Sequence, residues 1–173
     1  MRFVLKVLLT TLAMFALLAG PGRAGETEMA LLNAYIGNWA GAGVLVGGDK
    51  PEAFTCRLKV SKGRQEKVNY AGRCSLVNMN LSVTGTIIFN DRAGRYEATM
   101  RSNVGFSAAA VGVIQGKAIT FVLDEKQKDR GGNQMDIGSV LKLDHRGITV
   151  DFSVEFNRSG QVLTTSVPFG RQQ

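Results

Sequence analysis

Two cysteines, Cys56 and Cys74, have a spacing in this 173-residue chain that fits a structural disulfide. They lie in two neighbouring stretches of alternating side chains, at mirror-image positions about a polar turn at residues 62–67. Pairing the cysteines places Leu58 opposite Gly72, so that one face of the hairpin is apolar or small. Their separation excludes a Cys-x-x-Cys redox pair. The sequence predicts a half-buried antiparallel hairpin held by an internal disulfide.

The other face of this hairpin and its turn are basic, with Glu66 the sole acid among the cations. Such a patch can meet an anionic surface: lipopolysaccharide, acidic lipid headgroups or an acidic partner. It can also be a solvated face that only keeps the protein soluble. Nucleic acid is not expected, because aromatic residues do not alternate with the charges. The six cations are Arg57, Lys59, Lys62, Arg64, Lys67 and Arg73.

Residues suited to catalysis or metal binding are sparse. The only histidine, His145, stands in a polar turn, and no nucleophile has a histidine base beside it. Asp151 and Glu155 fall on the polar face of their strand, so no pair of inward carboxylates is expected. The acids of residues 124–133 alternate with lysines and arginine, which favours a solvated loop over a metal site. We therefore expect a protein that is not an enzyme and holds no metal.

Residues 1–24 have the features of an export signal. Two cations are followed by the apolar run 7–19, and Gly22 and Ala24 supply the small residues wanted before a cleavage site. The run is short for a bilayer crossing, which needs about 20 residues, although an uncleaved anchor stays open. Cleavage leaves residues 25–173 as one domain, lowers the net charge from +7 to about +4 and predicts a periplasmic or secreted location, where a disulfide persists.

The exported part begins with a short amphipathic segment, residues 26–36, of which 29–36 are predicted to form a helix that plugs one end of the fold. About ten short alternating stretches with glycine-rich turns follow, which predicts an all-β, antiparallel up-and-down barrel of eight to ten strands. A two-sheet sandwich is the alternative. The predicted inward face comprises Trp39, Leu58, Tyr70, Ile87, Phe89, Met100, Phe121, Ile137, Leu141, Phe152, Val154 and Phe156.

The run Gly37-Asn38-Trp39, placed between the helix and the first strand, resembles the G-x-W opening of the calycin superfamily, which includes lipocalins, fatty-acid-binding proteins and avidins. The longer run 37–43 resembles the G-x-W-x-G-x-G opening of nitrobindin-like haem barrels. The chain also resembles small exported proteins of alphaproteobacteria that have no assigned role. The resemblance implies a barrel with Trp39 packed at its closed end. Haem is not expected, because the one histidine lies in a turn, and no cofactor is predicted.

Two functions stay open. In the first, which the calycin resemblance implies, the barrel binds a small apolar or amphipathic ligand. In the second, an envelope protein acts through its surface, by the basic hairpin or the charged loop, on an anionic surface or a protein partner. The small residues 107–112 leave space that is either a cavity or the seat of the helix. The expected ligand-lining residues are Trp39, Leu58, Tyr70, Met100, Phe121 and Phe152.

Overall fold

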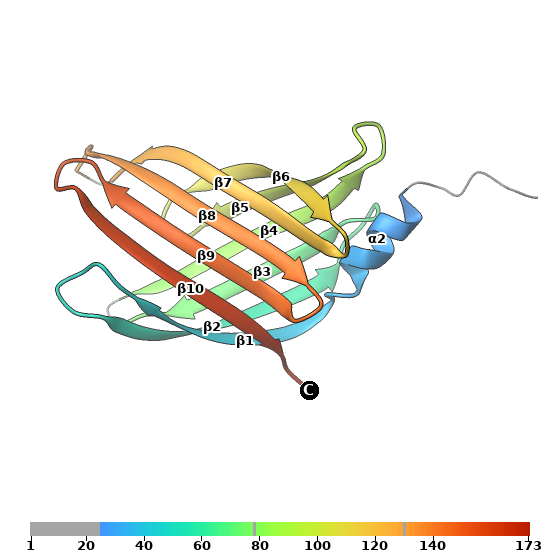
Figure 1. The fold of residues 1–173 in the computed structure, drawn as a ribbon, viewed down its shortest axis with the longest axis horizontal. Helices are drawn as coiled ribbons and strands as arrows, with labels where there is room; N and C mark the ends of the chain where they lie inside the picture. The colour runs from blue at the N-terminus through green and yellow to red at the C-terminus, as the bar shows by residue number, and fades with distance from the viewer. Residues whose placement is uncertain (1–24, 78, 130) are drawn as a thin grey trace, which may run out of the picture.

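Ten antiparallel strands form a closed barrel, in which each strand pairs with its neighbours in the chain and β1 closes the ring against β10 (Figure 1). The computed structural model describes residues 25–77, 79–129 and 131–173; the predicted export signal, residues 1–24, lies outside them. The predicted up-and-down barrel with one short helix is confirmed, and a sandwich is excluded. The elements are α2 (Glu26–Asn33), β1 (Gly37–Leu45), β2 (Glu52–Lys62), β3 (Val68–Ser75), β4 (Asn80–Asn90), β5 (Arg95–Ser102), β6 (Ser107–Gln115), β7 (Ala118–Lys128), β8 (Gln134–Asp144), β9 (Gly147–Phe156) and β10 (Gln161–Arg171).

The stapled hairpin has the predicted register. Cys56 pairs with Cys74 and Leu58 with Gly72 across β2 and β3, and a disulfide joins the two cysteines, whose Cα atoms are 4.0 Å apart. Alternation dictates this arrangement, because successive side chains of a strand point to opposite sides of the wall. Cys56 is buried on the inner side, and Arg57 beside it is exposed on the outer side. All the residues of the predicted inward face occupy inward positions of this alternation.

Helix α2 covers one end of the barrel (Figure 1). Leu32 is 1% exposed and belongs to the buried core. Two tyrosine hydroxyls at this end of the barrel join the α2 segment to the strands. Tyr96 of β5 donates to the Glu28 carbonyl at 3.1 Å, and Tyr35, just after the helix, donates to the Asp144 carbonyl at 3.2 Å. The helix therefore plugs the barrel, as predicted. No helix of the described residues is long and apolar enough to cross a membrane.

Two predicted boundaries were wrong. The helix occupies Glu26–Asn33 instead of 29–36, and the last three residues of that prediction form turns. The stretch 124–133 is not a loop throughout, because β7 continues to Lys128 and pairs with β8 residue by residue. Charged side chains persist in this strand because its outer face meets water, so their polarity did not mark a loop.

Candidate functional site

The end of the barrel beneath α2 is filled. Trp39 is 5% exposed, and its indole N–H donates to the Tyr35 carbonyl at 2.9 Å. The Arg171 guanidinium lies 4.5 Å from the centre of the Trp39 ring and donates to the Ile36 carbonyl at 2.8 Å. Phe121, 3% exposed, packs in the same cluster of buried side chains. Beneath α2 this cluster forms a packed floor to the barrel, with Trp39 at the closed end as the resemblance implied. The same cluster continues along β2 to Phe54, which lies opposite Gly43.

The other end, where β1 ends at Leu45 and β10 begins at Gln161, is packed differently; we call it the mouth. A second buried cluster there, formed by β7 to β9 and by Phe106 just before β6, is separate from the first. Between the two clusters, inward-facing side chains stay partly exposed although the wall is closed around them. We call the part of the interior that these half-buried side chains border the lumen. Its half-buried apolar lining includes Leu45, Leu58, Tyr70, Leu81, Val83, Met100, Leu141, Val150, Phe152 and Leu163.

The predicted ligand-lining residues separate into two groups. Leu58, Tyr70, Met100 and Phe152 are half-buried on inward positions and border the lumen. Trp39 and Phe121 lie buried in the floor cluster, so they present little of their surface to the lumen. Residues 107–112 also separate into two groups. Gly112 leaves room for the Phe121 ring and the Tyr96 Cβ, and the inward alanines that precede it in β6 lie nearer the mouth.

Polar groups of the lumen wall are few and mostly satisfied. The Tyr70 hydroxyl donates to the Thr99 carbonyl at 2.9 Å, and burial raises the pKa of Tyr70 to about 12. The Ser139 hydroxyl donates to the Asp151 carbonyl at 3.0 Å. The Thr165 Oγ1 is buried without a hydrogen-bond partner. The lumen therefore presents an apolar surface with isolated hydroxyl groups, to which inward Glu125 and Gln127 add polar side chains near the mouth.

The inward polar positions on β7 were not predicted from the sequence. Glu125 lies opposite Ile137 on β8, at a half-buried position of the inner side near the mouth. The signal was present in the chain, because Leu123, Glu125 and Gln127 continue the alternation that starts at Phe121. The charged residues in this stretch suggested a loop, so the alternation was not taken as part of a strand.

The six predicted cations do not form one patch. Arg57, Lys59 and Arg73 project from the outer wall of β2 and β3, where all three are exposed. Lys62 and Lys67 instead line a hollow of about 210 Å³ beside α2, together with acidic side chains of the helix and the turn. Arg64, also exposed, stands in the same turn. The structure thus separates an uncompensated wall group from a turn group with carboxylates nearby.

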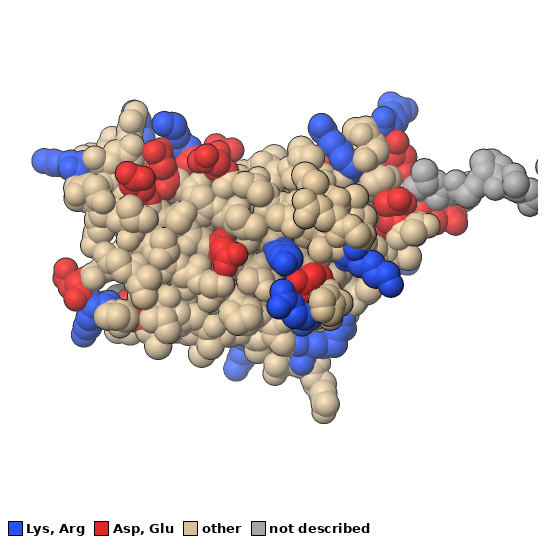
Figure 2. All heavy atoms as spheres, in the orientation of Figure 1, with Lys and Arg blue, Asp and Glu red and all other residues tan. Residues whose placement is uncertain are grey.

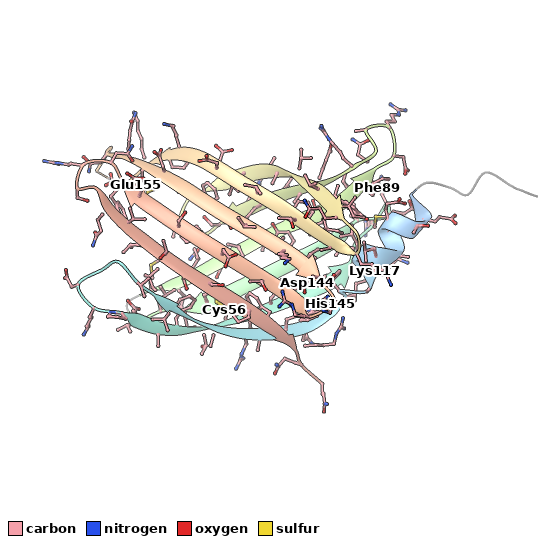
Figure 3. All side chains as sticks on the ribbon, in the orientation of Figure 1. Cys56, Phe89, Lys117, Asp144, His145 and Glu155 are labelled. Carbon is pink, nitrogen blue, oxygen red and sulfur yellow. A yellow bond between two sulfur atoms is a disulfide. The ribbon has the colours of Figure 1, made fainter. Side chains whose placement is uncertain are left out.

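His145 is exposed in the β8–β9 turn at the α2 end of the barrel, beside Asp144 (Figure 3). The Asp144 carboxylate accepts from the backbone N–H of Arg146 at 2.8 Å, and this bond is the main reason that the pKa of Asp144 is lowered. Glu155 lies at the opposite end of the molecule (Figure 3). Nowhere in the described ranges do three or more His, Cys, Asp or Glu residues converge as metal ligands would.

Comparison with known proteins identifies the fold and no family. No protein-family model matches the sequence, and no curated protein matches it. Among solved structures, the chain is similar to the crystal structure of Rv2717c from M. tuberculosis, with a TM-score of 0.63 and 16% sequence identity over 84% of this chain and 97% of that chain. This likeness supports the ten-stranded barrel and carries no statement about activity.

Proposed function

We propose that this protein binds a small apolar or amphipathic ligand in the lumen of its barrel, without catalysing a reaction. One observation carries the proposal: the buried core is divided into two clusters, and the apolar side chains between them keep exposed surface inside a closed wall. Packed interiors leave few voids larger than a water molecule, so half-buried apolar side chains inside a closed wall are what a site for an apolar ligand would present.

The lining sets the chemical class of that occupant. Apolar side chains dominate and a few hydroxyl groups interrupt them, which is the composition of sites for lipids and similar small molecules. The calycin-like opening at residues 37–39 agrees with such a role. A periplasmic or secreted location belongs to the same proposal, supported by the signal-like residues 1–24 and by the disulfide, which persists in oxidising compartments.

The experiment is an equilibrium titration with 11-(dansylamino)undecanoic acid, whose fluorescence rises in an apolar environment. Val83→Trp, which adds an indole at a half-buried inward position of β4, should lower the affinity at least tenfold. Thr84→Trp, on the exposed side of the same strand, is the matched control and should bind like the wild type. If the wild type binds no probe, or if both variants bind it equally well, the lumen is not the site.

A further inference from the structure

We propose that the outer wall formed by β10, β1, β2, β3 and β4 docks the protein on the surface of an anionic phospholipid bilayer, with Arg57 and Arg73 at the centre of the contact. We call this wall the basic face. The proposal goes beyond ligand binding, because it concerns the outside of the barrel and does not require an occupied lumen.

Acidic side chains are distributed unevenly around the barrel. Every strand carboxylate that points outward lies on β5 to β9, and the outward positions of β10 and β1 to β4 carry none. On the basic face, Arg57, Lys59 and Arg73 are the strand cations at outward positions. Blue side chains stand along the lower edge of Figure 2, where Figure 1 places β1 and β2. The outward acids are Glu97, Asp124, Asp136, Asp144, Asp151 and Glu155.

Arg57 and Arg73 stand directly opposite each other across the β2–β3 ladder. Like charges at opposed positions destabilise a sheet, and within the described ranges neither guanidinium has an ion pair or hydrogen bond. By contrast, Lys142 on the other side of the barrel pairs with Asp144 at 3.4 Å. An uncompensated pair of arginines at the middle of an acid-free wall is the arrangement that an external anion neutralises.

The surroundings of this pair favour a bilayer over a soluble polyanion. Beside Arg57 the wall has a shallow hollow of about 460 Å³ formed by small residues of β1 and by Pro168 of β10. Towards the mouth, the same face exposes Val44, Val46 and Val162, which are 48%, 42% and 43% accessible. Cations beside exposed apolar side chains are the composition of surfaces that lie in the interface of an anionic membrane.

The turn cations contribute less to this face. Lys62 and Lys67 share their hollow with Glu26 and Glu66, so the local field there is mixed. At the mouth, Asp49 and Lys50 similarly offset each other in sequence. The central test therefore concerns the two wall arginines.

The experiment is co-sedimentation of the full exported chain with vesicles of phosphatidylcholine containing 30% phosphatidylglycerol, at low ionic strength. Wild-type protein should bind these vesicles and not pure phosphatidylcholine. The double variant Arg57→Gln/Arg73→Gln should bind about 25-fold more weakly, since each surface cation contributes about fivefold to the partition. The control Lys117→Gln/Lys128→Gln removes two exposed cations of the opposite half, with the same net charge, and should retain wild-type binding.

Several outcomes would overturn the proposal. Equal loss in the two double variants would show that net charge, and not this face, is responsible. Equal binding to neutral vesicles would exclude an anionic contact. If inorganic phosphate releases the protein from the vesicles more strongly than chloride does at equal ionic strength, the arginines form a site for the free anion and not a membrane contact. As a folding control, Arg57→Gln/Arg73→Gln should unfold at a denaturant concentration at least as high as that of the wild type. Val83→Trp, whose lumen is blocked, should still bind the vesicles.

Discussion

At the scale of single residues, the inner wall is shaped by positions that lack a side chain. Gly85 on β4 leaves room for the Tyr70 ring, which crosses it and places its hydroxyl on the Thr99 carbonyl. A Cβ at Gly85 would lie 1.9 Å from the Thr99 carbonyl oxygen and 2.4 Å from the Tyr70 hydroxyl oxygen. The backbone itself would have to move, so this glycine is a packing requirement and not a flexible point.

Gly85→Ala should therefore lower the free energy of unfolding by about 2 to 3 kcal/mol, the cost of overpacking a well-packed site. Gly170→Ala is the matched control, because a Cβ at Gly170 on β10 meets nothing within 4 Å; it should change that free energy by less than about 0.5 kcal/mol. Chemical denaturation of the two variants and wild type measures both values. Equal stability of the two alanine variants would contradict the packing described at Gly85.

The tyrosines give a second expectation at this scale. Burial raises the pKa of Tyr70 to about 12, and burial with the nearby Glu28 and Tyr35 raises the pKa of Tyr96 to about 12. The pKa of Tyr35 is also raised, by burial and by the charge of Asp144. An unfolded tyrosine has a pKa near 10. Between about pH 10 and 12 the unfolded chain therefore binds fewer protons, and stability should fall as the pH rises through this window.

Absorbance at 295 nm during alkaline titration tests this directly. All three tyrosines of the chain have a raised pKa. Folded protein should show no tyrosinate with a midpoint near 10, and tyrosinate should form together with unfolding, followed in parallel by circular dichroism. A tyrosine that ionises near pH 10 while the barrel stays folded would disagree with this account.

At the scale of elements, the β2–β3 hairpin is the part most constrained covalently. Its disulfide joins residues 18 positions apart in the sequence, and closing a loop of this size stabilises a fold by about 3 kcal/mol in the chain-entropy model. Cys56→Ala/Cys74→Ala should lose about that much free energy of unfolding while keeping the barrel. Wild-type protein unfolded with a reductant is the control, since it keeps both side chains. A loss below about 1 kcal/mol in both experiments would show that the bridge is not a structural staple.

Helix α2 is held by packing more than by its own length, because a helix of eight residues is marginal alone. Leu32→Ala should cost about 2 to 4 kcal/mol, since this side chain is 1% exposed in the floor cluster. Asn33→Ala, at an exposed position of the same helix, should cost much less. Thermal unfolding of both variants measures the difference, and equal midpoints would mean that the helix does not plug the barrel.

The elements also show what could be predicted from the sequence. The register of the stapled hairpin followed from the two cysteines and strict alternation, because a slip of one residue would turn every side chain to the other face. The end of β7 did not follow, since Asp124 and Lys126 are outward residues of a strand whose inner side carries Leu123. The distribution of free space inside the barrel could not be predicted either: half-buried Leu58 and buried Trp39 are both inward apolar residues, and only the three-dimensional packing separates them.

At the scale of the whole molecule, the barrel has two kinds of asymmetry. Along its axis, the buried side chains beneath α2 give way to half-buried inward side chains towards the mouth. Around its axis, a half that includes Arg57 and Arg73 and has no acid at its outward strand positions faces a half that carries the outward carboxylates. The first asymmetry supports binding of a ligand inside, and the second supports docking on an anionic surface outside. The two proposals rest on different residues and can fail separately.

The central claim, a lumen that takes an apolar ligand, is tested most directly by methyl NMR of the protein with spin-labelled stearic acid. The methyl signals of inward, half-buried Leu58, Met100 and Val150 should broaden as the probe is added, because the nitroxide relaxes nuclei close to it. Outward Val113 and Val122, which are 57% and 61% exposed, should keep their signals. Broadening of the outward valines first, or no broadening of the inward methyl groups at a saturating concentration of probe, would contradict a ligand-binding lumen.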